Sequence, residues 1–428
     1  MASGPVRVTI IEPHEYSAFS PVGGCTPTAV RSQRSMPDCC SIFTWAEPGS
    51  RIPQGCRSIA ISPTHGWLAS RPCGGKAALI YEPGEFIRIR SALLGPRDFF
   101  YPNWPYPPTF LLILAPFGAL PYLYAFVSWG VVTLLGCITV VLLIARQRPA
   151  IGLLMASPYT LWNFLAGQNG FLTASLLGAS LLCLERRPVL AGVFVGCLTY
   201  KPQFGILLPV ALVASNQWRA LISAVATIGL LAGASIVAFG SAPWLAFPRN
   251  LVVQCGRNLF VGSDSNWGLL QTIYGLARYL GCVAVLAGVA QIVTTAGLGL
   301  IVWSVCRSQL RYVLKAATLS AATLIATPSA FAYDLAAIAI PIAFLASDQL
   351  RHGFLRGEQT ILLVLFGVVL TLLVIFADRP VGTTFGAVPL GPVVMFGLLG
   401  IALRRAWCCG DRRRFSANFC ETILATGD

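Results

Sequence analysis

The sequence predicts an all-α, polytopic integral membrane protein. Of its 428 residues, 56% are hydrophobic and only 11% are charged, whereas soluble domains carry about 25% charged residues. The mean hydropathy is +0.71. Between residues 105 and 405 the chain holds only six acidic side chains. We therefore expect a helical bundle of about ten to eleven membrane segments, built from apolar runs long enough to enter a bilayer.

The N-terminal 75 residues differ from the rest of the chain. They are rich in Ser, Pro, Arg, Gly and Cys, and they contain neither an apolar run of spanning length nor a signal-peptide core. We expect this stretch to be poorly ordered. The first apolar segment, 109–119, is short and bounded by prolines, which suits an interfacial or re-entrant helix. Segment 121–145 is long enough to span.

Further apolar segments follow at short intervals. Several are shorter than a bilayer crossing requires, so we predict broken or tilted helices packed inside the bundle, where protein can satisfy the backbone. The predicted segments are 150–166, 169–184, 188–200, 203–216, 219–240, 279–304, 312–328, 334–348, 359–377 and 386–403.

Charged residues between the segments predict the topology. The net charge of +14 raises the question of nucleic acid, but the arginines lie in short loops, as the positive-inside rule describes. No nucleic-acid partner is expected. The loops assigned to the cytoplasm carry Arg146 and Arg148, Glu185-Arg186-Arg187, Arg219, Arg307 and Arg311, Arg351 and Arg356, and Arg404-Arg405.

The alternate loops are then external, and the unusual polar residues gather there. They are 101–108, 167–169, 201–203, 241–278, 328–334 and 378–379. The long loop 241–278 holds Trp244, Trp267 and Tyr274, and we expect it to form an interfacial cap over the external face.

Two external motifs combine a helix break with polar side chains. Gly167-Gln168-Asn169-Gly170 is either a plain turn or a set of amides that bind sugar hydroxyls. In Tyr200-Lys201-Pro202-Gln203 the proline breaks a helix. Lys201 either snorkels to the interface or contacts a phosphate, and we favour phosphate contact.

Two further motifs also have a structural and a functional interpretation. Asp334 interrupts a hydrophobic run after Tyr333, where it could cap a helix, form a structural ion pair, or take part in binding or catalysis. The aromatic-proline loop that contains Tyr106 is either an interfacial aromatic belt or a platform for a sugar or lipid. The fourteen cysteines and three histidines show no metal-ligand spacing, so no metal site is expected.

In their order along the chain, these motifs resemble glycosyltransferase family 87. The ordered set consists of Tyr106-Pro107-Pro108 before a Pro-interrupted apolar helix, Gly167-Gln168-Asn169, the small-residue run Ala191-Gly192-Val193 leading to Lys201-Pro202-Gln203, and Tyr333-Asp334. The resemblance covers roughly residues 76–403. It divides the chain into a poorly ordered segment (1–75), a GT-C-like transmembrane domain (76–403) and a basic cytoplasmic tail (404–428).

The resemblance implies a GT-C-type fold and transfer of a mannose-like hexose. The donor would be a polyprenyl-phosphate sugar, the acceptor a lipid or glycan, and the site would lie on the external face of the bacterial inner membrane. No cofactor is implied, because phosphate is already a fair leaving group. Lys201 would neutralise that phosphate, while a carboxylate deprotonates the acceptor. The implied substrate-binding residues are Gln168, Asn169, Lys201, Gln203, Tyr333, Asp334 and Tyr106.

The sequence departs from the family where catalysis is expected. Family members carry a catalytic Asp just after their first membrane helix, followed by an aromatic stretch that Trp67-Leu68-Ala69-Ser70 resembles. No Asp lies near Trp67, and no hydrophobic helix precedes it. Either residues 1–66 are a frameshifted stretch, which we favour, or the chain is a degenerate homologue. Both interpretations predict a poor or inactive enzyme, with Asp334 or Asp264 as the fallback carboxylate.

Two other classes of function fit part of the pattern. Broken helices with polar residues also describe transporters and lipid flippases, although no inverted repeat is evident and the breaks collect on one face. The missing Asp also leaves a non-catalytic membrane scaffold as an alternative.

Overall fold

The computed structural model describes residues 76–94, 104–146, 152, 157–260, 267–268, 270–375 and 388–409. Contacts divide the chain into two units, Met1–Ser50 and Arg51–Asp428, and every described residue belongs to the second. The predictions that concern residues 1–75, including Trp67, and those for Asp264 fall outside the described residues.

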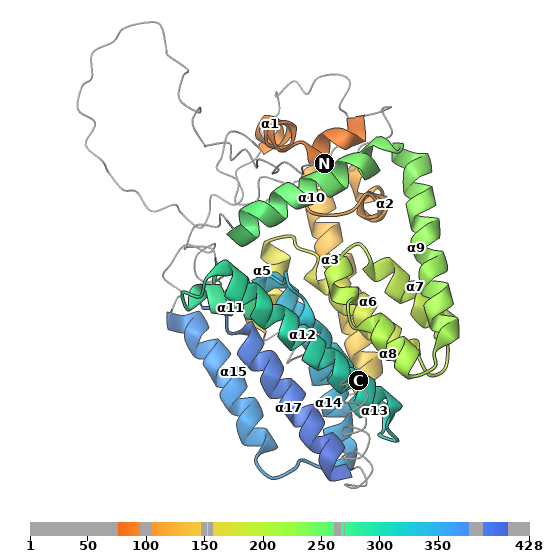
Figure 1. The fold of residues 1–428 in the computed structure, drawn as a ribbon. Helices are drawn as coiled ribbons and strands as arrows, with labels where there is room; N and C mark the ends of the chain where they lie inside the picture. Colours follow the sequence, from red (N-terminus) through yellow and green to blue (C-terminus); the bar gives the residue numbers. More distant parts are fainter. Residues whose placement is uncertain are drawn as a thin grey trace, which may run out of the picture. The chain divides into compact units, whose positions relative to one another are not determined.

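The described residues form a bundle of helices with no strand; an isolated bridge joins Leu270 to Phe331 (Figure 1). The predicted all-α fold is confirmed. In chain order the elements are η2 (Lys76–Tyr81), α1 (Pro83–Leu94), α2 (Thr109–Leu114), η3 (Phe117–Ala119), α3 (Tyr122–Ala145), α5 (Pro158–Leu165), α6 (Gly170–Cys183), α7 (Pro188–Leu198), η4 (Pro202–Gly205), α8 (Leu208–Ala214), α9 (Trp218–Phe239), α10 (Ala242–Phe260), α11 (Ile273–Tyr279), α12 (Ala284–Arg307), α13 (Tyr312–Ala326), η6 (Ala332–Ile338), α14 (Ala339–His352), α15 (Glu358–Ile375) and α17 (Gly391–Cys409).

Five described helices are long and apolar enough to cross a membrane: Leu123–Ala145, Trp218–Phe239, Ala284–Arg307, Ala332–His352 and Gly391–Cys408. The predicted short segments are indeed short helices, among them Gly170–Cys183, Pro188–Leu198 and Tyr312–Ala326. Together they agree with a polytopic membrane bundle in which short helices are enclosed by longer ones.

Glycines allow the central helices to approach closely. A Cβ added at Gly192 of α7 would lie 2.2 Å from the Ala220 carbonyl oxygen of α9, and one at Gly196 would lie 2.5 Å from Thr227 Cβ. Such small-residue contacts bring membrane helices together. The second contact lies further along both helices than the first, so α7 and α9 run in the same direction.

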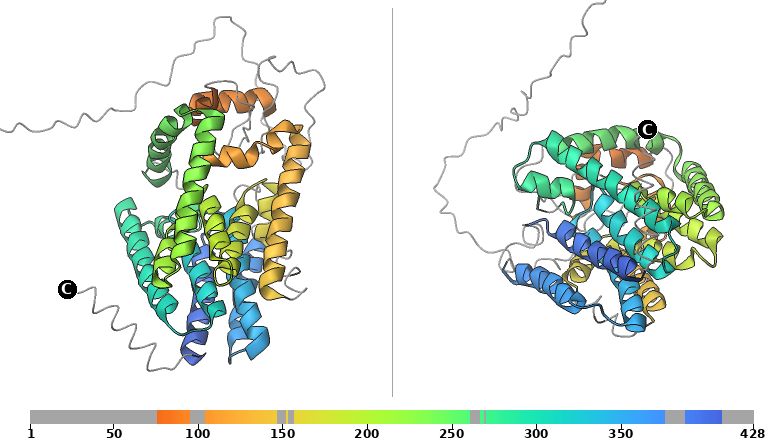
Figure 2. Two further views of the ribbon diagram at one scale, coloured as in Figure 1. Left: turned by 90° about the vertical axis from the view of Figure 1, so that its right-hand side faces the viewer. Right: turned by 60° about the horizontal axis from the view of Figure 1, so that its bottom comes forward.

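The same reasoning orients α3 against α6. Gly136 faces Ser175 and Gly178 faces Val140, so these helices are also parallel. At 24 and 22 residues, α3 and α9 rise roughly 33–36 Å, whereas α6 and α7, with 14 and 11 residues, rise roughly 17–21 Å. Figure 2 shows α3 and α9 extending well past α6 and α7. The polar connections at the ends of α6 and α7 therefore lie within the height of the long helices.

Residues 241–278, predicted as an external loop, contain α10 and α11. Trp244 donates its indole N–H to Ser235 Oγ of α9 at 2.9 Å, which holds the start of α10 against the end of α9. Phe247 of α10 packs on Tyr81 of η2, with 5.9 Å between ring centroids. The described residues of this segment are thus mainly helical, and the placement of the segment as an interfacial cap stays a prediction.

Candidate functional site

Lys201 and Asp334 form a buried ion pair, although they lie 133 residues apart in sequence. Lys201 is 3% exposed and Asp334 is 1% exposed. The chain leaves α7 just before Lys201, and Pro202 starts the short helix η4, so the lysine stands at the predicted break. Because its ammonium is buried in protein, Lys201 does not snorkel to an interface.

Asp334 bonds at the start of a helix and pairs with the lysine. It lies in the first turn of η6, where its Oδ2 accepts a hydrogen bond from the Phe331 N–H at 3.1 Å. Its Oδ1 accepts from Lys201 Nζ. Asp334 is thus the third residue of η6 and not its N-cap, which is Phe331, although its side chain does bond to the N-cap N–H. The structural ion pair is present as well, and both carboxylate oxygens have partners.

Aromatic rings surround the ammonium group of Lys201. Its Nζ lies 4.9 Å from the ring centroid of Tyr333, 5.6 Å from that of Phe204 and 5.9 Å from that of Tyr106. A cation over ring faces is stabilised by their quadrupoles. The lysine is thus held by one carboxylate and three rings, in a region shielded from water.

Tyr106 belongs to an aromatic stack inside the protein. Its ring centroid lies 4.7 Å from that of Phe110, which stacks on Tyr200 at 4.7 Å and 17°. Trp104 and Tyr106 are both buried, so these two residues of the aromatic loop do not form a lipid-facing belt. Burial raises the pKa of Tyr106, and the negative charge of Asp334 raises it further, so the phenol remains protonated at neutral pH.

The Gly167–Gly170 segment is a turn that also reaches the site. Gly167 has a φ of +59°, and Trp129 donates its indole N–H to the Gln168 carbonyl at 3.2 Å. A Cβ at Gly170 would lie 2.2 Å from the Tyr333 carbonyl oxygen. Only glycine allows this contact, which brings the amide-bearing turn against the residue before Asp334.

Amide groups at this turn are buried. Tyr200 donates its hydroxyl to the Asn169 carbonyl at 3.2 Å, and its oxygen lies 2.7 Å from Thr173 Oγ1. Asn163 Oδ1 accepts from the Gly170 N–H at 2.8 Å. Within the described residues, Asn163 Nδ2 and Asn169 Oδ1 have no hydrogen-bond partner. Buried polar groups are normally paired, so these two atoms are exceptions among the buried side chains of the described residues.

Gln203 lies at the edge of the site and links two loops. Its Nε2 donates to the Ser329 carbonyl at 3.5 Å, and its own carbonyl accepts from Thr327 Oγ1 at 3.3 Å. Of the predicted residues, Tyr106, Tyr333 and Asp334 lie around Lys201. Gln168 and Asn169 belong to the adjoining turn, and half-buried Gln203 lies at the edge. The sequence analysis did not single out Asn163, which precedes the turn in α5, or Thr173, which follows it in α6.

A second group of buried charges lies at the other end of the bundle. Arg405 of α17 donates to Glu358 at 2.8 and 2.9 Å, and also to Asp348 and the Gly353 carbonyl. Arg311 approaches Asp348 at 3.1 Å. We call Asp348, Glu358, Arg311 and Arg405 the arginine cluster. Helix α17 continues through Arg404 and Arg405 to Cys409.

The two groups match the predicted division of the loops. Arg146 follows α3, and Arg186 follows the parallel helix α6, at the ends away from Gln168. Tyr312 donates its hydroxyl to the Leu181 carbonyl near the end of α6, which places the α12–α13 connection at that end as well. Which end faces the cytoplasm stays a prediction.

With this geometry in place, comparison with known families is decisive. The sequence model of glycosyltransferase family 87 matches residues 104–328, more than half of the chain. The chain belongs to glycosyltransferase family 87. The matched region includes Tyr106, Gln168, Asn169, Lys201 and Gln203 and ends before Asp334. Family 87 membership means a membrane glycosyltransferase and argues against a transporter or flippase. No curated protein and no solved structure matches the chain.

Proposed function

We propose that this family 87 protein transfers a hexose from a polyprenyl-phosphate sugar to a lipid or glycan acceptor. The observation that carries this proposal is the buried Lys201–Asp334 pair, with the rings of Tyr106 and Tyr333 around the lysine ammonium. Lys201 is the cation for the leaving phosphate. The unpaired amide atoms of Asn163 and Asn169 suit the sugar hydroxyls.

The depth of the pair favours a lipid-linked donor. Trp129 of α3 bonds to Gln168 beside the site, and α3 extends seven residues beyond that level, from Tyr122 to Ser128. Seven helical residues rise roughly 10 Å. A phosphate that reaches this level while its hydrocarbon tail stays in the bilayer has the form of a polyprenyl-phosphate sugar. We place this site on the external face of the bacterial inner membrane, as the loop charges predict.

Asp334 acts in this scheme as a positioning residue. One of its oxygens holds Lys201 and the other holds the Phe331 N–H, so neither is ready to take a proton from an acceptor. A carboxylate other than Asp334 would then deprotonate the acceptor. The family carries it in the region that corresponds to Trp67, where this sequence has no Asp and which lies outside the described residues. The expectation that the chain transfers sugar poorly stays a prediction.

Donor binding tests the proposal without requiring catalysis. Purified protein would be incubated with labelled polyprenyl-phosphate mannose and challenged with polyprenyl phosphate, polyprenol or a nucleotide sugar. We expect polyprenyl phosphate to compete and the other two to fail, because both the tail and the phosphate are recognised. Equal competition by polyprenol, or binding of the nucleotide sugar alone, would contradict the proposed donor. A parallel assay of transfer by membranes would test the predicted low activity.

A further inference from the structure

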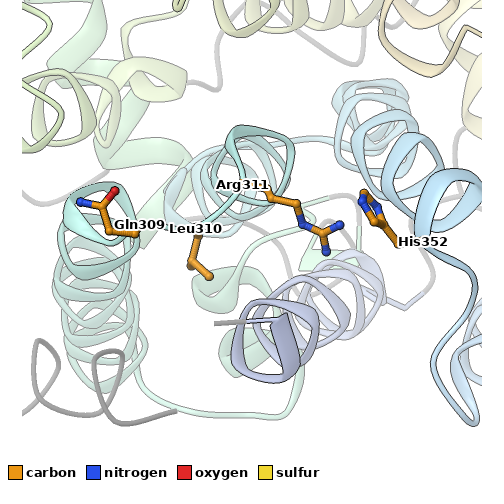
Figure 3. Close-up of a pocket in the computed structure, with 4 residues that line it drawn as sticks. All are labelled: Gln309, Leu310, Arg311 and His352. Atoms are coloured by element: carbon orange, nitrogen blue, oxygen red, sulfur yellow. The ribbon is translucent and has the colours of Figure 1, made fainter. Parts of the chain in front are cut away.

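The two ends of the bundle differ in how far their charged side chains are covered. At the end that holds the arginine cluster, a cavity of about 310 Å³ is lined by Gln309, Leu310, Arg311 and His352 (Figure 3). The side chains of Arg311 and His352 are 32% and 47% exposed. Lys201 is only 3% exposed. A ligand for Lys201 must therefore pass or move the rings that enclose its ammonium, so the residues that hold these rings influence binding.

One of these rings, that of Tyr106, belongs to a short segment that is held at both ends. Asn250 of α10 donates from its Nδ2 to the Trp104 carbonyl at 2.8 Å. Tyr81 of η2 donates its hydroxyl to the Tyr106 carbonyl at 2.9 Å. All four residues are at most 5% exposed. The backbone from Trp104 to Tyr106 is thus fixed by two buried hydrogen bonds from residues that lie far away in sequence.

Helix α10 turns one face toward this segment. Trp244, Phe247 and Asn250 follow one another at a spacing of three residues, which places them on the same side of a helix. Trp244 bonds to α9, and Phe247 packs on Tyr81, so this face holds η2 as well as the aromatic segment. Val252, on the same helix, is 73% exposed. The polar residue Asn250 therefore belongs to the inner face of α10.

Ring contacts carry this arrangement to Lys201. Trp104 packs edge-on against Tyr106, with 5.2 Å between ring centroids, and the Tyr106 ring lies 5.9 Å from Lys201 Nζ. The attraction between a cation and a ring depends on how the ring is placed. Asn250 has a single hydrogen bond among the described residues, since its Oδ1 has no partner there. Its removal therefore releases one defined contact of the segment.

We infer that Asn250 and Tyr81 are positioning residues of the donor site. By fixing the backbone around Tyr106, they keep its ring against the Lys201 ammonium, and α10 thereby sets how this cation meets a phosphate. The inference rests on the proposed function, which assigns Lys201 to the donor. Loss of either hydrogen bond loosens the ring, lets water reach the ammonium, and weakens a contact that is preorganised for the donor.

Amine labelling tests the placement of Tyr106 without a donor. The chain has only three lysines, Lys76, Lys201 and Lys315, so acetylation of each can be followed separately by mass spectrometry on the full-length protein. Lys315 lies near the start of α13, at the arginine-cluster end, where it donates to the Cys306 carbonyl. It serves as an internal reference, because a general loss of stability would expose it together with Lys201.

The variants remove one hydrogen bond at a time. In Asn250→Ala and in Tyr81→Phe we expect Lys201 to react about fivefold faster, the change in local opening that follows the loss of one neutral hydrogen bond. The rate of Lys315 should stay unchanged. Val252→Ala truncates an exposed side chain of the same helix and is the matched control, in which both lysines should react as in the unaltered protein.

Donor binding then tests whether this placement matters for function. Purified full-length protein would be titrated with labelled polyprenyl-phosphate mannose. Asn250→Ala should bind it about fivefold more weakly than the unaltered protein or Val252→Ala. In a Tyr106→Leu background, which lacks the ring, Asn250→Ala should cause no further loss, because a residue that acts through Tyr106 then has nothing to position. A purely structural role would not produce this dependence.

Three results would overturn the inference. They are an unchanged Lys201 rate in both variants, equal rises for Lys201 and Lys315, and an equal loss of donor affinity with and without the Tyr106 ring. If Asn250→Ala does not fold, Tyr81→Phe, which keeps its aromatic ring, replaces it in both assays. If the labelling results hold but the unaltered protein does not bind the donor, the proposed function is wrong and the placement of Tyr106 by α10 stands.

Discussion

Asp334 and Asp348 lie on one continuous helical segment, Ala332–His352, and both are buried, yet their partners differ. Asp348 is shared by Arg405 and Arg311, and Arg405 also bonds to Glu358 and the Gly353 carbonyl. Asp334 has one lysine and one backbone N–H. Lys201 directs its remaining surface to aromatic rings.

In the proposed function, this difference separates an ion-pair cluster that holds helices together from the pair that binds the donor. The guanidinium of Arg405 is planar, carries several N–H donors that match carboxylates, and joins three helices. The ammonium of Lys201 is a compact charge with rotatable donors. The arginine cluster is nearly saturated. For the Lys201 pair, we propose that a phosphate-linked sugar supplies further hydrogen bonds, including partners for the amide atoms of Asn163 and Asn169 that have none among the described residues.

Removal of Arg405 should have the largest effect. Arg405→Met leaves two buried carboxylates, Asp348 and Glu358, without their shared cation. Breaking a single buried pair in this way lowers stability by about 3–5 kcal/mol, so this variant should fail to accumulate as a folded protein. Arg404→Met, which removes an exposed charge next to it, is the matched control. Detergent-solubilised yield and thermal unfolding measure both; equal behaviour of the two variants would contradict the structural role.

Lys201→Met should destabilise by a smaller but similar amount, because it breaks one buried ion pair, whereas Arg405→Met breaks two and leaves Glu358 without a cation. We expect about 3 kcal/mol. The double variant Lys201→Met/Asp334→Asn removes both charges, and the asparagine oxygen can still accept from the Phe331 N–H. It should recover most of the lost stability. Chemical unfolding in detergent checks this; a double variant no more stable than Lys201→Met would show that the pair is not the main source of the loss.

Tyr200→Phe should have the smallest effect. The substitution removes the hydroxyl that bonds to Thr173 and the Asn169 carbonyl but keeps the ring stacked on Phe110. We expect a loss of about 1 kcal/mol, with donor binding weakened because the Asn169 turn is less well held. Tyr124→Phe, at an exposed position of α3, is the control. Identical unfolding curves for Tyr200→Phe and Tyr124→Phe would show that the Tyr200 hydroxyl does not stabilise the site.

The long helices were predictable, and some of the polar contacts were not. Segments 121–145 and 219–240 match α3 and α9 within one residue because uninterrupted apolar runs define them. Helix α10 was missed because Pro248 and its mixed polarity resemble a loop. Arg405 was assigned to a tail because an Arg-Arg pair after an apolar run normally marks a membrane boundary; nothing in the local sequence shows that Glu358 and Asp348 lie beside it.

For the candidate site, local sequence identified the residues but not their pairing. Proline breaks and isolated charges in apolar runs singled out Lys201 and Asp334. Their contact depends on how η6 packs against the ends of α6 and α7, a tertiary arrangement that Gly170 permits by its contact with Tyr333. A single sequence carries no direct signal for two residues 133 positions apart.

The central claim is that Lys201 serves the donor phosphate as well as the fold. The most direct measurement is the affinity of polyprenyl-phosphate mannose for the Lys201→Met/Asp334→Asn variant, made on protein shown to be folded by its unfolding transition. We predict that this variant is stable but binds the donor at least about tenfold more weakly, the loss of one charge-assisted contact. Unaltered affinity in the folded variant would contradict the account and leave Lys201 with a structural role alone.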